Sequence, residues 1–309
     1  MQGGIKLKTL GIIDIGSNSI KLIIVDIDNN SHKEIFHKKF QTRLSNFVNK
    51  ENKELSVEGA KDFFKIISIL KRYCDDFECD EIIAVATESL RQIKNSTEII
   101  NHVYESLGIK IKVLSSKEEC YFGYISSIPE DLYDYVHLDM GGGSVEISLV
   151  KNKILVECVS IPIGALKITN KFHIENGLSK DEKDSIQKYI YNKLNNITWI
   201  DECKTLPVVM IGGSIKTIGR IHQKENDIIS NIHGYELFYD DINLLLEKIS
   251  IMSLEEIICS TGISKTRGDI LLGALITLNS IVSYLQSSKI IISKYTIREG
   301  IINHYIKNI

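Results

Sequence analysis

The sequence lacks several features that mark particular classes of protein. Only three prolines occur in 309 residues, and no low-complexity stretch forms a flexible linker between separate modules. The net charge of −3 excludes a globally basic nucleic-acid binder. We therefore expect no nucleic-acid partner, and an anionic substrate would have to be attracted by a local positive field.

Cysteine and histidine motifs are absent as well. The six cysteines show no C-x-x-C spacing, and no histidines have the spacing of metal ligands. Scattered thiols of this kind favour a reducing compartment over disulfides or a zinc site. Two histidines, His32 and His37, are five positions apart on a predicted strand, so they are expected to face opposite sides of it.

Long apolar runs are absent too. Asp14 interrupts the first apolar run, so the N-terminus does not resemble a signal peptide. The longest later run, residues 270–285, contains Gly, Thr, Asn and Ser, and we interpret it as a buried core helix rather than a bilayer span. These features predict a cytoplasmic protein with no membrane partner.

The length suits two domains, and strand-like segments alternate with helix-like ones, which is typical of an α/β fold. Strands are expected at 10–15, 21–26, 33–42, 81–86, 110–114, 136–139, 145–150, 154–161, 208–211 and 289–292. Helices are expected from Ser56 and from Ser96, and at 180–194, 270–285 and 297–306. We place the domain boundary in the loop holding Pro129, which gives domains 1–125 and 126–309, with a terminal helix that could return to the first domain.

One arrangement occurs twice. Residues 11–19 and 137–146 each read as an apolar strand ending in Asp, a tight Gly/Ser turn, and the start of a second strand. Small residues let a backbone approach a phosphate, and its N–H groups then point at the oxygens. The Asp could hold a divalent cation on that phosphate, or simply cap its own turn. Two such turns facing each other across a cleft would form a phosphate-handling site.

Five segments in order resemble the exopolyphosphatase / guanosine pentaphosphate phosphohydrolase family: 14–19, 86–95, 115–119, 139–146 and 212–214. Further matches at 162–164, 267–269 and 297–300 extend the resemblance over nearly the whole chain. That family belongs to the actin-like, sugar-kinase and heat-shock-protein ATPase superfamily. The resemblance implies the short form of the family: two ribonuclease H-like (actin-like ATPase) α/β domains, mixed sheets flanked by helices, an active site in the interdomain cleft, and a homodimer.

The activity implied by the resemblance is metal-dependent hydrolysis that releases orthophosphate from the ends of inorganic polyphosphate. Guanosine pentaphosphate presents a chemically equivalent terminal phosphoryl group and remains the alternative substrate. An actin-like ATPase or kinase is a further alternative, although no second glycine cluster follows residues 212–214. A sensor that binds without hydrolysis is the last, and the retained carboxylates argue against it.

The carboxylates receive their roles from the resemblance. Glu119 matches the catalytic base, although by sequence alone Glu118 and Glu119 are better explained as a solvated acidic pair opening a helix. Asp139 and Glu146 match residues that position Mg²⁺, or another divalent cation, or the attacking water, so Glu146 is both a catalytic and a metal candidate. Asp14 is expected to reach the same cation through solvent.

The resemblance also implies phosphate contacts from Arg91, which lies in a segment that matches the family's phosphate-binding loop and whose planar fork suits phosphate oxygens. Small and polar residues of three turns complete the expected cradle: Ser17, Asn18, Ser19, Gly142, Gly143, Ser144, Gly213 and Ser214. Lys216 and Arg220 could extend a basic track or form a solvated helix face.

Four positions depart from the family pattern, and one of them, Ser214 in place of a common Thr, is conservative. Ser116 stands where the family usually has Gly, Cys120 where it usually has Ala, and Val145 where Thr is common. None of these changes removes a carboxylate, so hydrolysis remains the expected chemistry. The changes at Ser116 and Val145 leave the rate and the substrate preference open.

Overall fold

A computed structural model describes residues 8–28, 31–49, 51–175, 177–261 and 263–308. It divides into two compact units. The first contains the described residues up to Glu119 together with those from Ile301 onward, and the second contains Cys120–Gly300. The division falls inside helix α4 (Ser116–Ser126), slightly before the boundary suggested by the sequence, and the end of the chain belongs to the first unit.

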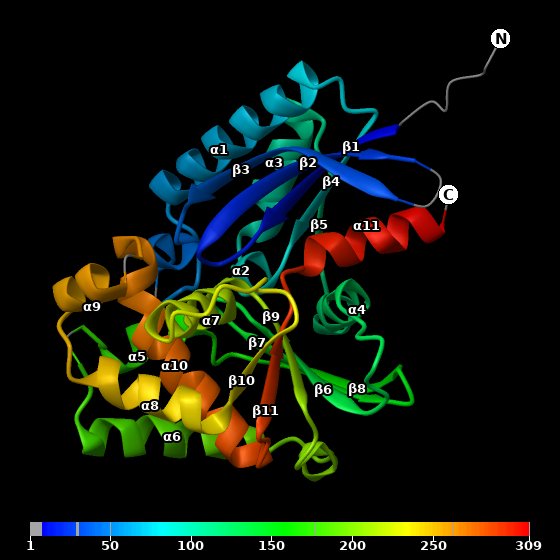
Figure 1. Ribbon diagram of the computed structural model, residues 1–309. Helices are drawn as coiled ribbons and strands as arrows, with labels where there is room; N and C mark the ends of the chain where they lie inside the picture. Colours follow the sequence, from blue (N-terminus) through cyan, green and yellow to red (C-terminus); the bar gives the residue numbers. More distant parts are fainter. Residues whose placement is uncertain (1–7, 29–30, 50, 176, 262, 309) are drawn as a thin grey trace. The chain divides into compact units, whose positions relative to one another are not determined.

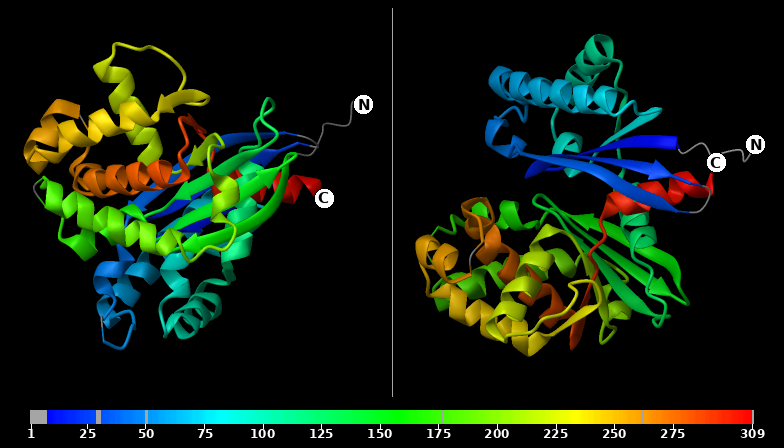
Figure 2. Two further views of the ribbon diagram at one scale, coloured as in Figure 1. Left: turned by 90° about the horizontal axis from the view of Figure 1, so that it is seen from below. Right: turned by 45° about the horizontal axis from the view of Figure 1, so that its top comes forward.

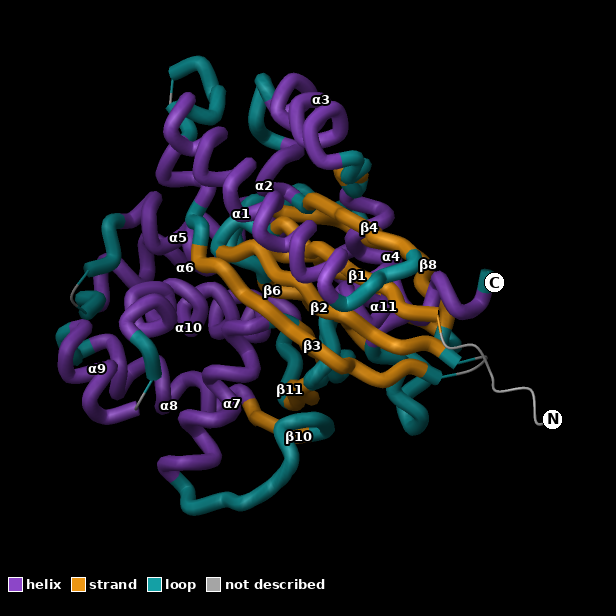
Figure 3. Tube along the Cα trace, turned by 90° about the horizontal axis from the view of Figure 1, so that it is seen from above, coloured by secondary structure: helices purple, strands orange, loops and turns teal. Residues whose placement is uncertain are grey.

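The first unit contains a five-stranded mixed sheet in the order β3-β2-β1-β4-β5. Its strands are β1 (Lys8–Ile15), β2 (Ser19–Ile27), β3 (His32–Gln41), β4 (Glu81–Ala86) and β5 (Ile111–Val113). The first three form an antiparallel meander, whereas β4 runs parallel to β1 and β5 parallel to β4. Four of these strands, β3, β2, β1 and β4, are labelled side by side in Figure 3.

Helices α1 (Val57–Asp76) and α3 (Ser96–Leu107) cover one face of this sheet (Figure 2). The predicted cap of α1 is present, because the Ser56 side chain accepts a hydrogen bond from the Gly59 N–H. A short helix, α2 (Glu88–Arg91), follows β4 directly. This placement puts α2 at the same sheet edge as the turn after β1.

The last helix, α11 (Ile297–Lys307), returns to the first unit over its final turns. There the Tyr305 hydroxyl donates a hydrogen bond of 2.6 Å to Glu81, and Lys8 contacts both of these side chains. This cluster raises the pKa of Lys8, chiefly through its hydrogen bond with Tyr305.

The second unit repeats the sheet plan of the first. Its six-stranded sheet has the order β10-β11-β9-β6-β7-β8. The strands are β6 (Tyr135–Met140), β7 (Val145–Lys151), β8 (Ile154–Ile161), β9 (Val208–Ile211), β10 (Tyr235–Phe238) and β11 (Lys289–Ile292). Strands β6–β8 form the antiparallel meander, and β9 and β11 are the parallel strands. The sequence did not indicate β10, a short antiparallel strand at the sheet edge.

Each face of the second sheet carries helices (Figure 1). On one face, Tyr124 of α4 packs with Tyr135, Val150 and Val209. The other face shares a large apolar core with α5 (Ala165–Phe172), α6 (Lys180–Leu194), α7 (Gly213–Glu225), α8 (Tyr239–Ser250), α9 (Leu254–Thr261) and α10 (Lys265–Leu285).

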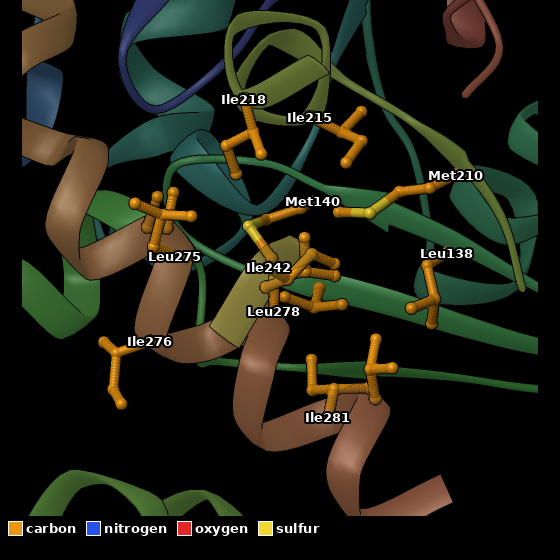
Figure 4. Close-up of a cluster of buried hydrophobic side chains, with 14 of the residues drawn as sticks. Leu138, Met140, Met210, Ile215, Ile218, Ile242, Leu275, Ile276, Leu278 and Ile281 are labelled. Atoms are coloured by element: carbon orange, nitrogen blue, oxygen red, sulfur yellow. The ribbon is translucent and has the colours of Figure 1, made fainter. Parts of the chain in front are cut away.

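Helix α10 forms the centre of that core. Figure 4 shows Leu275, Leu278 and Ile281 among side chains from the strands and from α7 and α8. By length and composition alone residues 267–285 could cross a membrane, but 83% of the most apolar window is buried inside the protein. The prediction of a buried core helix is therefore confirmed.

One expectation about strand β3 is wrong. His32 pairs with Ile27 and His37 with Ile23, and these two β2 residues share a face. The register shifts between Ile24 and Val25, where Ile35 is the extra residue of a β-bulge. Because the bulge inserts one residue, His32 and His37 face the same side instead of opposite sides.

The central position of Leu278 predicts a large effect of truncation. Leu278→Ala should lower the free energy of unfolding by about 2–5 kcal/mol, since this fully buried side chain would leave a cavity. Leu244→Ala is the matched control, because Leu244 on α8 is 69% exposed and its loss should cost less than about 0.5 kcal/mol. Urea unfolding measures both, and equal losses would contradict this account of the core.

Candidate phosphate-binding and catalytic site

The turn between β6 and β7 has a defined backbone orientation. The carbonyls of Gly141, Gly142 and Gly143 accept hydrogen bonds of 3.0–3.2 Å from backbone N–H groups of residues 164–167, at the start of α5. A trans peptide directs the C=O of one residue and the N–H of the next to opposite sides. The N–H groups of residues 142–144 therefore point away from α5, as an anion-binding concavity requires.

Gly164 makes this arrangement possible. A Cβ at this position would lie only 2.6 Å from backbone atoms of Gly142 and Gly143. No side chain fits there without displacing the turn. The match at 162–164 noted in the sequence is thus the segment that orients the turn.

Two carboxylates stand beside the turn. Asp139 on β6 and Glu146 on β7 are opposite each other in the strand register. Glu146 is almost fully buried, and its Oε1 accepts hydrogen bonds of 2.7 Å from both Ser144 and Ser160. Ser144 and Glu146 therefore lie on one side of the hairpin, as strand alternation requires of residues two apart. Ser160 was not predicted, although it lies directly opposite Glu146 on β8.

The turn after β9 approaches the same carboxylates. Gly212 has φ of 117°, and a Cβ there would meet the Met140 carbonyl at 2.8 Å and Asp139 Oδ1 at 3.3 Å. The start of α7, with Gly213 and Ser214, therefore lies against Asp139. N–H groups in the first turn of a helix favour anions, so this end of α7 suits phosphate as well.

A partly buried arginine holds the α7 turn in place. Arg267 donates to the Gly213 carbonyl at 2.8 Å and also contacts the Thr217 hydroxyl. Burial lowers the pKa of Arg267, and the nearby Arg220 guanidinium lowers it further. Lys216, by contrast, donates to the Lys294 carbonyl at 2.9 Å. Near Arg220, one of the two residues of the expected basic track with Lys216, the structure places a third cation, Arg267. The sequence had assigned no role to Arg267.

In the first unit, the turn after β1 carries its own polar contacts. Asp14 accepts a hydrogen bond of 3.2 Å from Lys21, which is opposite it in the register. The Ser17 hydroxyl donates to Glu88 at 3.3 Å. Glu88, the first residue of α2, is only 8% exposed, and neither it nor Lys21 was singled out from the sequence. Lys21 could have been found from the hairpin register alone.

Asn18 and Ser19 complete this turn. The Asn18 carbonyl accepts from the N–H groups of Thr42 and Arg43, and its side-chain oxygen accepts from Gln41 at 2.6 Å. The Ser19 carbonyl accepts from the Gly16 N–H at 3.1 Å. These bonds fix the turn backbone, so the expected phosphate contacts of Ser17, Asn18 and Ser19 would come from a preorganised loop.

The two hairpins share a backbone plan but differ in charge. Asp14 faces Lys21 across β1 and β2, whereas Asp139 faces Glu146 across β6 and β7. The first pair is an ion pair within the chain. The second brings two carboxylates together, and like charges in directly opposite positions repel. A bound cation would remove that repulsion only at the second hairpin.

The acidic pair at the start of α4 is divided between two environments. Glu118 caps the helix through Ser115 and pairs with Lys112 at 2.5 Å. Lys112, together with the Ser115 N–H, lowers the pKa of Glu118 to about 2. Glu119 is instead 5% exposed and accepts a 3.0 Å contact from Arg91. The solvated-pair interpretation therefore describes Glu118 and not Glu119.

Arg91 connects this glutamate to the strand edge. Its Nη1 donates to the Leu114 carbonyl at 2.7 Å and to Glu119. Since a guanidinium carries five N–H donors, Arg91 keeps further donors for a phosphate. The structure thus brings together Arg91 and Glu119, and separately Asp139, Glu146 and the glycine turn. That both sets face one cleft stays a prediction.

The donor set fits a hard divalent cation, because carboxylate oxygens are the ligands that Mg²⁺ prefers. Asp139 and Glu146 form a pair rather than a closed cage. In the ranges that the structure describes, no three His, Cys, Asp or Glu side chains gather into a ready-made metal site. Mg²⁺ typically keeps waters and binds through one or two carboxylates plus phosphate, so a pair is sufficient. The participation of Asp14 stays a prediction.

Comparison with known proteins identifies the class. Residues 23–308 match the model of the Ppx/GppA phosphatase family. A bifunctional 3-dehydroquinate synthase/phosphatase of Fusobacterium nucleatum is 28% identical over 96% of this chain and 46% of that protein, so the chain spans about half its length. Exopolyphosphatase 1 of Mycobacterium leprae is 20% identical over 95% of this chain and 88% of that protein.

The fold is shared with a solved structure, an exopolyphosphatase from Cytophaga hutchinsonii. The TM-score is 0.88 at 18% identity, over 98% of this chain and 99% of the other. The chain therefore has the actin-like ATPase fold, with two mixed sheets flanked by helices. It belongs to the Ppx/GppA phosphatase family.

The contact between Gly164 and the turn predicts a binding defect. In Gly164→Ala the added methyl would push residues 142–143 aside and misdirect the N–H groups. Affinity for inorganic tripolyphosphate should fall at least tenfold, equivalent to about 1.4 kcal/mol, measured by titration calorimetry. A variant that stays folded and binds as tightly as the wild type would refute this role for the turn.

The second hydroxyl on Glu146 predicts an effect on metal use. Ser160→Ala removes one of the two hydrogen bonds that orient this carboxylate. Loss of such an outer partner typically weakens metal affinity about 10–100-fold. The Mg²⁺ concentration for half-maximal orthophosphate release should rise accordingly, and Ser160→Thr, which keeps the hydroxyl, should stay near the wild type. An unchanged Mg²⁺ dependence in Ser160→Ala would show that Glu146 does not hold the cation.

Proposed function

We propose that the chain is an exopolyphosphatase that hydrolyses the terminal phosphoanhydride bond of inorganic polyphosphate and releases orthophosphate. The observation that carries the proposal is the turn at residues 141–144, whose N–H groups point away from α5 beside Asp139 and Glu146. A set of N–H donors next to paired carboxylates matches a phosphoryl group carried with a cation. The exopolyphosphatase names of the M. leprae and C. hutchinsonii proteins support this substrate class.

The roles follow from chemistry and burial. Asp139 and Glu146 hold Mg²⁺, which when bound neutralises charge on the transferred phosphoryl group. The N–H groups of residues 142–144 bind its oxygens. Glu119 accepts the proton of the attacking water, and Arg91 orients its carboxylate.

Burial supports Glu119 rather than its neighbour as the base. Glu118 is committed to capping α4 and to its ion pair with Lys112, and it is exposed to bulk water. Glu119 is nearly buried, and its position is fixed by Arg91. A base must hold one water in one place, which suits the fixed carboxylate.

This assignment predicts opposite outcomes for two adjacent substitutions. With Mg²⁺ and long-chain polyphosphate, Glu119→Gln should reduce orthophosphate release about 10²–10⁴-fold, the usual contribution of a general base. Glu118→Gln removes the same charge one residue away and should change the rate less than about threefold, since the bonds of Glu118 join it to Ser115 at the helix start and to Lys112.

The substrate is tested in the same assay with guanosine pentaphosphate and ATP in parallel. Release from polyphosphate that Glu119→Gln abolishes supports the proposal. Release from guanosine pentaphosphate alone would move the protein to the alarmone branch of the family. Turnover of ATP alone would indicate an ATPase or kinase, and full activity of Glu119→Gln would refute the base assignment.

A further inference from the structure

A pair of thiols lies on the same sheet face as the carboxylate pair. In the register, Glu146 is opposite Ser160 and Ser148 is opposite Cys158. Strand alternation puts Glu146 and Ser148 on one face, so Cys158 and Ser160 share that face with them. Cys158 is thus two positions along β8 from the hydroxyl that holds Glu146.

Helix α4 covers this face and supplies the second thiol. The His137 ring, on the same face, contacts Ser127 at 3.0 Å and lies against Gly123. One turn earlier on the helix, Cys120 is 1% exposed and lies next to Cys158 of β8. Cys120 also lies close enough to Glu146 for the negative charge of that carboxylate to raise the pKa of the thiol. The two cysteines therefore join α4 to β8 beside the candidate metal carboxylate.

We propose that Cys120 and Cys158 form a reversible, peroxide-reactive dithiol whose oxidation links α4 to β8 and inhibits the enzyme. The functional half of this inference rests on the proposed hydrolase activity. The covalent half does not, because the disulfide can be observed directly.

Exposure determines which thiol reacts first. Cys158 is half-buried, whereas Cys120 is enclosed, and its contact with Cys158 together with burial raises the pKa of Cys120. The sulfur of Cys158 attacks hydrogen peroxide, breaks the O–O bond and becomes a sulfenic acid, with release of one water. Cys120 then attacks that sulfur, the S–OH bond breaks, and a second water leaves with the Cys120 proton. Two thiols are oxidised by two electrons, and peroxide is reduced to two waters.

The disulfide would act on the catalytic end of α4. A disulfide replaces the non-bonded contact of the two sulfurs by a covalent bond of defined geometry, so its formation draws α4 and β8 together at this point. Cys120 directly follows Glu119, the candidate base, and Cys158 is on the strand whose Ser160 orients Glu146. A displacement of about 1 Å at reacting groups can cost roughly 10²-fold in rate.

A second thiol pair provides an internal comparison. Cys74 and Cys79 meet where α1 ends, with the Cys79 N–H bonded to the Cys74 carbonyl at 2.9 Å. Both sulfurs lie near Gly11, on β1. Trypsin leaves Cys74 and Cys79 in one peptide, 73–91, but separates Cys120 (118–151) from Cys158 (154–167). A link between those two peptides therefore reports the proposed bond alone.

The experiment treats the reduced full-length chain with hydrogen peroxide, then measures orthophosphate release and maps the peptides without reductant. We expect peptides 118–151 and 154–167 to appear joined and two hydrogens lighter, with about a 100-fold loss of activity that dithiothreitol restores. Cys120→Ala, which restores the residue usual in the family, should keep its activity in peroxide and carry a sulfenic acid at Cys158. Cys259→Ala, which removes an exposed cysteine outside both pairs, should respond like the wild type.

Two results would overturn the inference. The first is the absence of the joined peptides at peroxide concentrations that oxidise the exposed Cys259. The second is equal peroxide inhibition of the wild type and Cys120→Ala. If the untreated protein hydrolyses neither polyphosphate nor guanosine pentaphosphate, the proposed function fails, while the joined peptides still decide whether the dithiol exists.

Discussion

The backbone of residues 141–143 packs directly on the first turn of α5, and the rest of the candidate site depends on that contact. Three carbonyls are turned inward to α5, so the following N–H groups face outward. Ile168 anchors α5 in the apolar core, which transmits the rigidity of the core to the turn. Consecutive glycines cost conformational entropy on folding. In return, the backbone of the turn approaches Gly164 so closely that a Cβ would not fit there.

The sequence predicted most of the strands because their signals are local. Apolar runs, an Asp at a strand end and a glycine turn all lie within ten residues, and β1, β2, β6 and β7 followed from them. Distinguishing Glu119 from Glu118 required the fold, since only the fold brings Arg91 against Glu119 and holds that arginine on the Leu114 carbonyl. The bulge at Ile35 was missed because the register of β3 against β2 is known only once the two strands are paired.

Polar partners that come from another strand were also beyond sequence reasoning. The partners of Ser160 and Cys158 can be inferred only from the register of β8 against β7. The cysteines were interpreted as scattered thiols because neither pair has a recognised short motif, although Cys120 meets Cys158 across a helix–sheet interface. Residue spacing along the chain does not reveal such contacts. Once the strand pairing is known, the alternation of side chains shows which of them share a face of the sheet.

The two hairpins also differ in charge, and this difference ranks the candidate metal ligands. Asp14 is balanced by Lys21 within its own hairpin, so its negative charge is already matched before any ligand arrives. Asp139 and Glu146 occupy the corresponding positions with two negative charges, and their mutual repulsion falls when a cation binds between them. We infer that Asp139 and Glu146 are the main ligands and that Asp14 contributes less. The same backbone would then serve structure in one unit and cation binding in the other, through the exchange of a lysine for a glutamate.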